Sequence, residues 1–258
     1  MKNLSNISSQ IKPIALKAGE IIMSYLLKDK KIEYKEEINM VTEADKESEN
    51  YIVKSLKELF PNDGILAEEN HKIESKSGYT WVIDPLDGTT SFSHNFPFFA
   101  VSIALVNEKN IPVLGVVYNP FYNEYFEAYE NSGAKLNSKP INVSTVDNIN
   151  KALIGTGFPY YRREHMQRIL NRLGNFLNVV HDMRRTGSAA LDICFVAAGR
   201  LDAYYEEGLK PWDTAAAYRI LIEAGGMASK FDGKDFDINF PEIIASNAKI
   251  HPQVIKLC

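Results

Sequence analysis

The segment WVIDPLDGTTSF, residues 81–92, constrains the fold of this 258-residue chain more than any other. Its first residues are aromatic, β-branched or apolar, which is typical of a buried strand. Pro85 has no N–H and a fixed φ, so it predicts that the strand ends there. Asp84 and Asp87 would then lie at a strand end, where sheet proteins hold ligands in a crevice.

The residues after these acids are suited to bind an anion, but the two carboxylates beside them would repel it. Gly88 lets the backbone approach a ligand closely, and the N–H groups of Gly88, Thr89 and Thr90 can form a nest for an anion. The acids repel that anion unless a divalent cation lies between them, and hard oxygen ligands favour Mg²⁺ or Mn²⁺. An ordinary surface turn is the alternative, because Asp-Gly is a common turn pair.

Two further acidic motifs favour the cation. Glu68 ends another strand-like run, in the segment AEE, and Asp213 opens a helix-like run, in PWDTAAA. Taken alone, paired glutamates are typical of a solvated face, and Asp213 is typical of a helix N-cap. Together with Asp84 and Asp87, however, these two acids can converge across one cleft and hold two or three cations.

Hydrophobic periodicity predicts a layered α/β (α+β) fold. Helical spacing of apolar residues covers residues 8–27 and resumes from Thr42. Strand-like runs follow, and from about residue 149 strands alternate with helices. We therefore expect an N-terminal α+β part, residues 1–148, with an antiparallel sheet and the metal-binding motifs. A C-terminal α/β part, residues 149–258, would complete the site. Strands are expected at residues 65–68, 79–84, 98–106, 113–118, 124–129, 152–155, 178–184, 202–206 and 243–246, and later helices at 163–173, 188–198 and 213–223.

The composition argues against several classes of protein. A formal net charge of −4 does not provide the basic face of a broad nucleic-acid footprint, so direct nucleic-acid binding is not expected. Cys194 and Cys258 have no metal-ligand spacing and indicate a reduced, cytoplasmic protein. The N-terminal segment lacks the pattern of a secretory signal, and no stretch is long and apolar enough to span a bilayer.

These motifs resemble those of a known family. Residues 81–92 are similar to the first signature of the inositol monophosphatase family, residues 211–216 to the second, and residues 68–69 to its upstream acidic pair. Further similar segments extend the resemblance over nearly the whole chain and favour the bacterial branch: residues 41–45, 187–192, 199–202 and 245–247. The chain departs from the family pattern at Ser91, where many relatives have asparagine, and at Ala217, where glycine is frequent.

The resemblance implies an α-β-α-β-α layered sandwich of the inositol monophosphatase and fructose-1,6-bisphosphatase type. It also implies a Mg²⁺-dependent, lithium-sensitive phosphomonoesterase that is often a homodimer. The matching metal ligands are Glu68, Asp84, the carbonyl of Leu86, Asp87 and Asp213. These residues would hold two or three Mg²⁺ ions, or Mn²⁺ in their place.

The resemblance also implies catalytic residues. Glu68 and Thr89 would hold the attacking water, and Asp45 would partner Thr89. The N–H groups of Gly88 and Thr89 would face the phosphate. Lys35 is similar to a lysine on a mobile loop of the metal site. The water would attack phosphorus directly, without a covalent enzyme intermediate.

The remaining implied contacts are with the substrate, and they are Asp87, Gly187, Ala189, Glu206 and Asp213. The N–H group of Ala189 and the side chain of Glu206 would lie near ring hydroxyls. From the residues alone, we would instead interpret residues 187–190 as an ordinary helix start and Glu206 as a solvated strand acid.

The leading functional hypothesis is hydrolysis of inositol 1-phosphate or a similar small phosphorylated polyol or sugar. A second hypothesis keeps the chemistry but changes the substrate to fructose 1,6-bisphosphate, 3′-phosphoadenosine 5′-phosphate, NADP or histidinol phosphate, on which relatives act. A third is a protein that binds the transcription machinery while retaining its phosphatase site, as some bacterial relatives do.

Overall fold

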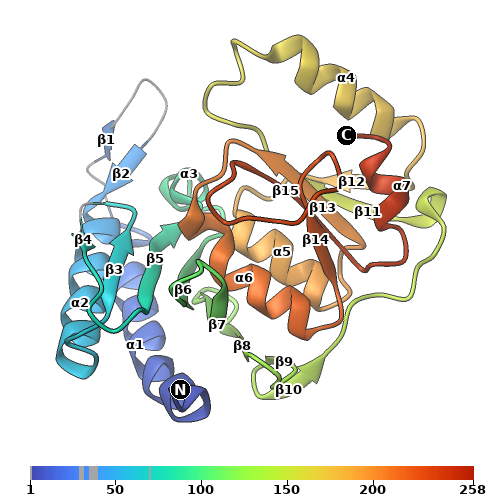
Figure 1. Cartoon of the computed structure of the whole chain (residues 1–258). Coiled ribbons are helices and arrows are strands. Elements are labelled where there is room, and N and C mark those ends of the chain that lie inside the picture. The colour runs from blue at the N-terminus through green and yellow to red at the C-terminus, as the bar shows by residue number, and fades with distance from the viewer. Residues whose placement is uncertain (1, 29–31, 35–39, 70) are drawn as a thin grey trace.

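The computed structural model describes residues 2–28, 32–34, 40–69 and 71–258. Within these residues the elements form five layers in the order α-β-α-β-α (Figure 1). The layered sandwich expected from the sequence is therefore confirmed. Lys35 lies outside the described residues.

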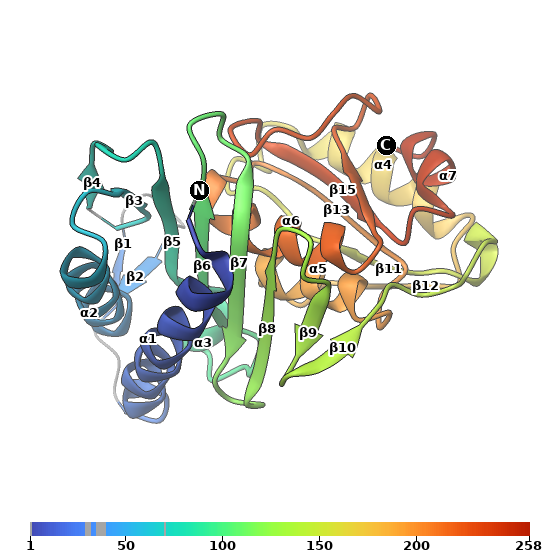
Figure 2. The same cartoon turned by 60° about the horizontal axis from the view of Figure 1, so that its bottom comes forward.

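The first two layers are a helix pair and a large sheet. The helices are α1 (Leu4–Tyr25) and α2 (Glu43–Leu59). The strands are β3 (Gly64–Ala67), β4 (Lys72–Ile73), β5 (Thr80–Asp87), β6 (Ala100–Val106), β7 (Pro112–Asn119), β8 (Glu124–Tyr129), β9 (Ala134–Leu136) and β10 (Lys139–Ile141). In the described part of the chain they form an eight-stranded sheet, in the order β10-β9-β8-β7-β6-β5-β3-β4. β5 to β10 are antiparallel neighbours, whereas β3 runs parallel to β5. Both helices cover one face of this sheet (Figure 2).

The other three layers follow in the C-terminal half. The strands β11 (Leu153–Thr156), β12 (Asp182–Arg184), β13 (Ala203–Glu207), β14 (Met227–Ser229) and β15 (Glu242–Ser246) form a mixed sheet in the order β12-β11-β13-β15-β14. The helices α5 (Ala189–Ala197) and α6 (Pro211–Glu223) lie between the two sheets, while α4 (Met166–Leu177) and α7 (His251–Ile255) cover the outer face of the second sheet (Figure 1). Short elements complete the described chain: β1 (Ile32–Tyr34), β2 (Met40–Thr42), α3 (Thr89–Ser93) and the 3-10 helix η1 (Ile149–Lys151).

Helices on both faces of the large sheet explain why β6 and β7 are almost entirely apolar. Every residue of β6 and β7 is buried, because α1 packs on one face of these strands and α6 packs on the other. Strands covered on both faces do not need alternating polar residues. α6 also approaches β7 very closely, since a Cβ atom added to Gly115 would lie 2.1 Å from the carbonyl oxygen of Ala216. Only glycine permits this contact.

The expectation that the strand ends at Pro85 is wrong. β5 continues to Asp87, and its register against β6 shifts between the pair Asp84–Ser102 and the pair Asp87–Ala100. The shift inserts an extra residue into β5, which is a β-bulge. A bulge tolerates proline because the missing N–H is not needed for the ladder there. The two acids therefore lie on an irregular strand end rather than beyond it.

Some other boundaries differ from the predictions. α1 begins at Leu4, where the side chain of Asn3 caps it, so Pro13 lies inside the helix and not near its first turn. α4 begins only at Met166, and the strand expected at residues 178–184 is limited to Asp182–Arg184. No helix in the described part of the chain is long and apolar enough to cross a membrane.

Candidate active site

Three aspartates meet where β5 ends and α6 begins. One carboxylate oxygen from each of Asp84, Asp87 and Asp213 lies within 4.8 Å of the others. Asp84 and Asp87 are buried, and Asp213 is half-buried. The bulge in β5 and the first turn of α6 thus bring together three of the four acids that the sequence predicts to converge, and Glu68 is not part of this cluster.

Asp213 serves α6 as well as the cluster. Its Oδ2 atom accepts a hydrogen bond of 2.7 Å from the N–H of Lys210, in a capping arrangement. The N-cap residue is therefore Lys210 and not Asp213, which caps the helix start from the third position of α6, and this capping does not exclude a place in the acidic cluster. A carboxylate has a second oxygen that remains available to a ligand.

Asp87 is held by the start of α5. Its Oδ2 atom accepts hydrogen bonds from the hydroxyl of Ser188 at 2.6 Å and from the N–H of Ala190 at 2.8 Å. Gly187 reaches this position with φ at 97°, which favours glycine, and a Cβ atom there would lie 2.9 Å from Oγ of Ser91. Residues 187–190 are thus a helix start, as the residues alone suggest, and this start is fixed to Asp87.

The electrostatics of the cluster are unfavourable without a cation. Burial, followed by the negative charges of Glu68, Asp87 and Asp213, raises the pKa of Asp84 well above its usual value. Burial and then the charge of Asp87 raise the pKa of Asp213. The pKa of Asp87 rises to about 6, mainly because of burial. No described lysine or arginine forms an ion pair with any of the three acids. Such a group requires protons or a metal ion.

Glu68 and the pair Thr89–Asp45 lie beside the cluster. The N–H of Glu68 donates to the carbonyl of Ile83 at 3.2 Å, and its charge raises the pKa of Asp45 and of each clustered aspartate. The hydroxyl of Thr89 lies 3.0 Å from Oδ1 of Asp45. The structure therefore places these expected site residues together, while their catalytic roles stay predictions.

Asp45 is also a capping residue of α2. Its Oδ2 atom accepts the N–H of Thr42 at 2.8 Å and the hydroxyl of Thr42 at 2.5 Å. Burial is the main reason why its pKa rises to about 6. The carbonyl oxygen of Leu86 lies 3.1 Å from Oγ1 of Thr89, so the expected backbone ligand is next to this pair.

Glu206 lies in a packed environment on β13. It accepts a hydrogen bond from the hydroxyl of Tyr204, and a Cβ atom added to Gly157 would lie 2.2 Å from its carboxyl group. Burial raises its pKa to about 7, although the positive charge of Arg185 opposes this shift. The solvated strand acid that the residues alone suggested is therefore not what the structure shows.

Sequence reasoning missed Ser188 and Asp192. Asp192 is buried on α5, where its Oδ2 atom accepts the hydroxyl of Thr186 at 2.8 Å. Asp192 follows Ser188 by four residues, a spacing that places two side chains on one face of a helix. The helix predicted at residues 188–198 therefore contained a sequence signal for this pair. Ser188 binds Asp87 directly, and Asp192 binds Thr186, which precedes the start of α5.

The chain is similar to known proteins over nearly its whole length. The model of the inositol monophosphatase family matches residues 3–258. The chain is 42% identical over 241 residues to the Synechocystis protein named inositol-1-monophosphatase, covering 93% of this chain and 84% of that one. It is 41% identical over 238 residues to the Vibrio cholerae protein named Nus factor SuhB, covering 91% of this chain and 89% of that one.

Solved structures show the same similarity. The inositol monophosphatase of Anabaena superposes with a TM-score of 0.90 at 36% identity, covering 99% of this chain and 96% of that one. The suhB protein of Bartonella henselae superposes with a TM-score of 0.93 at 34% identity, covering 98% of each chain. The resemblance seen in the sequence is thereby confirmed, and this chain belongs to the inositol monophosphatase family of phosphatases, which act on small phosphorylated substrates.

Proposed function

We propose that this chain hydrolyses the phosphate monoester of a small polyol, most readily inositol 1-phosphate, with Mg²⁺ held by the acidic cluster. The observation that carries the proposal is the convergence of Asp84, Asp87 and Asp213, buried or half-buried, within 4.8 Å. The relative named inositol-1-monophosphatase supports the choice of substrate.

The donor set fits a hard divalent cation. Carboxylate oxygens are the ligands that Mg²⁺ and Mn²⁺ prefer, and the acids lack a described basic partner. Asp84, Asp87 and Asp213 would hold the ions together with Glu68 and the carbonyl of Leu86. When bound, such ions lower the pKa of a water molecule and stabilise the leaving alkoxide.

Thr89 and Asp45 would orient the attacking water. A Thr89 hydroxyl that donates its single proton to the Asp45 carboxylate keeps lone pairs free to accept from water. The water, held between Thr89 and Glu68, would then direct its own lone pair at phosphorus. Direct attack inverts the configuration at phosphorus, so product phosphate from a chiral, isotopically labelled ester distinguishes it from a covalent intermediate.

The substrate would bind between the metal ligands and the start of α5. The N–H groups of Gly88 and Thr89 would face the phosphate, and Asp87 and Asp213 would lie next to the leaving oxygen. Gly187, the N–H of Ala189 and the carboxyl group of Glu206 would select hydroxyl groups of the alcohol. Polar groups at the edge of a site commonly provide such specificity.

A second candidate function follows from the comparisons. Relatives at about the same identity are named either inositol monophosphatase or Nus factor SuhB. A role in transcription that used another surface could coexist with an intact acidic cluster. Specific retention of RNA polymerase by immobilised protein, surviving the substitution Asp84→Asn, would favour that role.

We further propose a cytoplasmic homodimer. Both cysteines are free, which suits a reducing compartment. Phe96, Phe121 and Tyr122 are each 45–50% exposed. The ring of the half-buried Phe98 lies 5.0 Å from that of Phe96 and 6.1 Å from that of Tyr122, which in turn lies 5.1 Å from the ring of Phe121. A contiguous apolar group of this kind is typical of an interface. Light scattering coupled to size-exclusion chromatography would measure the subunit number.

The decisive experiment is a phosphate-release assay over a substrate panel with Mg²⁺, with Mn²⁺ and with added Li⁺. We expect the highest kcat/KM for inositol 1-phosphate, no turnover after chelation, and inhibition by Li⁺. The panel should include fructose 1,6-bisphosphate, 3′-phosphoadenosine 5′-phosphate, NADP and histidinol phosphate. A far higher kcat/KM for one of these would replace the proposed substrate, while metal-independent turnover would contradict the proposed chemistry.

A further inference from the structure

The first half of α2 carries polar side chains on a face that is apolar in its second half. Ile52 and Leu56 are buried, and the residues one or two turns before them on this face are Asp45, Ser48 and Glu49, which are buried as well. Burying a polar group costs free energy unless it forms hydrogen bonds. The partners of these three residues therefore explain their place on this face.

Glu49 binds the segment that follows β3. Its Oε2 atom accepts the N–H of Glu69 at 2.8 Å, and its Oε1 atom lies 2.7 Å from Nδ1 of His71. The ladder between β3 and β5 ends at Ala67, so Glu69 lies beyond it. A side chain of α2 thus holds the backbone next to Glu68 past the end of the ladder.

Ser48 binds the bulge of β5. Its hydroxyl donates to the carbonyl of Pro85 at 3.1 Å, in a buried position. The register between β5 and β6 is interrupted between Asp84 and Asp87, so Pro85 has no registered partner among the described strands of that pair. Ser48 therefore supplies a hydrogen bond where the sheet pairing is broken, between two expected metal ligands.

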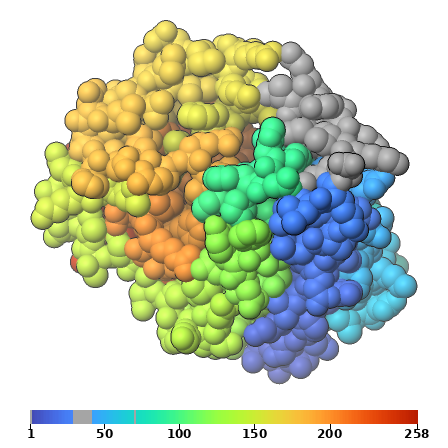
Figure 3. Space-filling view, turned by 180° about the vertical axis from the view of Figure 1, so that it is seen from behind, coloured from blue at the N-terminus to red at the C-terminus, as the bar shows by residue number. Residues whose placement is uncertain are grey.

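Asp45 makes the third contact of this face. Its Oδ1 atom accepts the hydroxyl of Thr89, the first residue of α3, at 3.0 Å. The N-terminal helices, in blue, and the segment around α3, in green-blue, share one face of the molecule (Figure 3). One face of α2 thus holds three irregular segments of the site: the residues after β3, the bulge of β5 and the start of α3.

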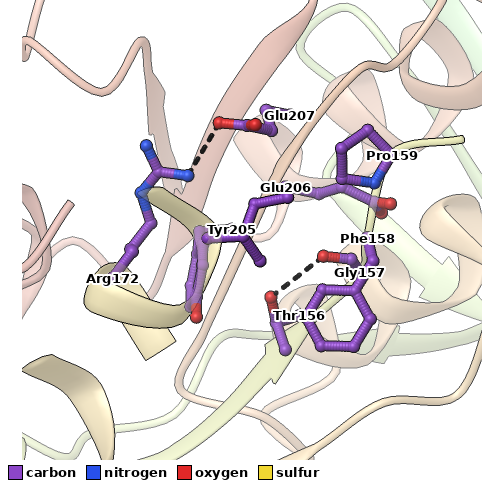
Figure 4. Close-up of a pocket in the computed structure, with 9 residues that line it drawn as sticks. Thr156, Gly157, Phe158, Pro159, Arg172, Tyr205, Glu206 and Glu207 are labelled. Atoms are coloured by element: carbon purple, nitrogen blue, oxygen red, sulfur yellow. Dashed lines mark hydrogen bonds and ion pairs between the residues drawn. The ribbon is translucent and has the colours of Figure 1, made fainter. Parts of the chain in front are cut away.

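Glu206 is held in another way, by close packing. Figure 4 shows Gly157, Phe158 and Pro159 around Glu206. The cavity among these residues, about 10 Å³, has room for no more than one water. Side-chain packing therefore fixes Glu206, whereas hydrogen bonds from α2 fix the backbone segments that carry expected metal ligands.

We propose that Ser48 and Glu49 are positioning residues, which set the distance between Glu68 and the acids of β5 for a bound divalent cation. The inference rests on the proposed function and adds to it two residues that are not themselves ligands. Mg²⁺ requires near-ideal octahedral geometry, so a small displacement of one ligand segment weakens its binding. Removing a group that orients a metal ligand typically lowers metal affinity about 10- to 100-fold.

The test measures Mn²⁺ binding by electron paramagnetic resonance, which detects free Mn²⁺ and needs no substrate. Ser48→Ala and Glu49→Ala should each weaken Mn²⁺ binding about 10-fold. They should raise the Mg²⁺ concentration for half-maximal phosphate release by a similar factor, while kcat at saturating Mg²⁺ changes less. Glu49→Gln keeps an acceptor for the N–H of Glu69, so its Mn²⁺ affinity should stay within about 3-fold of wild type.

Two substitutions on the same helix are matched controls. The hydroxyl of Ser55 donates to the carbonyl of Tyr51 within α2 at 2.9 Å, and Glu58 is exposed. Ser55→Ala and Glu58→Ala should therefore leave Mn²⁺ affinity unchanged. Thermal unfolding in EDTA shows whether each variant folds. Ser48→Ala removes a single oxygen atom, so it tests the inference even if Glu49→Ala does not fold.

Several outcomes would overturn the inference. Folded Ser48→Ala protein with wild-type Mn²⁺ affinity and a lower Tm would show that the hydrogen bond serves only the fold. An equal loss of affinity in the controls would show that any change in α2 has this effect. Wild-type protein that binds Mn²⁺ but hydrolyses no phosphate ester contradicts the proposed function alone, and Mn²⁺ binding still decides the roles of Ser48 and Glu49. Wild-type protein that binds no Mn²⁺ contradicts both.

Discussion

At the scale of single residues, the acids of the site repel one another, and a bound cation would relieve that repulsion. Asp84 is 2% exposed and lies among other carboxylates. Each negative charge there raises the free energy of the metal-free protein, and a cation reverses that effect. The proposed metal binding would therefore be linked to stability at these positions.

The substitution Asp84→Asn separates the two effects. Phosphatase activity should fall about 100-fold or more, because a metal ligand is lost. In EDTA, however, the variant should be more stable than wild type by about 1 kcal/mol, or roughly 2–4 °C in Tm, because a repelled buried acid is gone. A phosphate-release assay measures the activity, and thermal unfolding with EDTA and with Mg²⁺ measures the stability. The exposed Asp147→Asn is the control, and a Tm of Asp84→Asn that still rises with Mg²⁺ as in wild type would contradict the metal role.

The acids were predictable because each stands at a recognisable strand end or helix start. The contact between Ser188 and Asp87 was not, for a physical reason. This hydrogen bond joins two residues that lie 101 positions apart in the sequence. Contacts of this kind depend on tertiary packing, which local pattern does not encode.

At the scale of elements, the placement of α6 decides the geometry of the site. α6 carries Asp213 in its first turn and lies against β7 through the contact between Gly115 and Ala216. A side chain at position 115 would push α6 away from the sheet. It would move Asp213 relative to Asp84 and Asp87, which are anchored on β5.

Two glycine substitutions test this dependence. Gly115→Ala should destabilise the protein by about 2–3 kcal/mol through overpacking, and should lower kcat/KM about 10-fold or more by displacing Asp213. Gly174→Ala is the matched control, because nothing lies within 4 Å of a Cβ atom at that position on α4. It should stabilise the protein by about 0.5–1 kcal/mol through helix propensity. Urea unfolding measures the stability of each variant, and steady-state kinetics measure its kcat/KM. Equal stability of the two variants would contradict the close approach of α6 to β7.

The errors in predicting elements have local causes. Pro85 normally marks the end of a strand, but a bulge between Asp84 and Asp87 allows β5 to continue. β12 is shorter than expected because Val179 and Val180 donate to the carbonyl of Phe176 and close the end of α4. The β-branched side chains of Val179 and Val180 favoured the prediction of a strand. In the structure the hydrogen bonds of their N–H groups instead end helix α4.

At the scale of the whole molecule, one buried histidine joins three elements at the C-terminal edge. His251 of α7 is 3% exposed and lies 2.8 Å from Oγ of Ser246 on β15 and 2.9 Å from Oγ of Ser229 on β14. Burial lowers its pKa below the usual 6.5. The folded protein therefore favours the neutral imidazole.

This histidine should make stability depend on pH. Because its folded pKa is lowered, the unfolded chain binds a proton more readily, and the stabilising contribution is complete only above about pH 6.5. Wild type should lose that contribution as pH falls from 7 toward 5, and His251→Asn should show a smaller loss. Urea midpoints across this range measure the difference, with the exposed His181→Asn as control. Parallel pH profiles of wild type and His251→Asn would contradict the assignment.

The layered fold as a whole was predictable from the sequence, but its division into two parts at residue 148 was less so. The order of helices and strands indicated the layers, and the structure confirms them. The boundary at residue 148 stays a prediction, because one apolar cluster between the sheets contains both Val82 and Ile243. Residues far apart in the chain thus share a core that no segment forms alone.

The position of Asp213 has a consequence for biosynthesis. Asp84 and Asp87 leave the ribosome more than 120 residues before Asp213 does. If the proposed function holds, a partly translated chain would present an incomplete ligand set with weak affinity for Mg²⁺. Ion capture would then wait until α6 has docked against β7, so the ion would stabilise only nearly finished molecules, and its uptake during refolding would report on that docking.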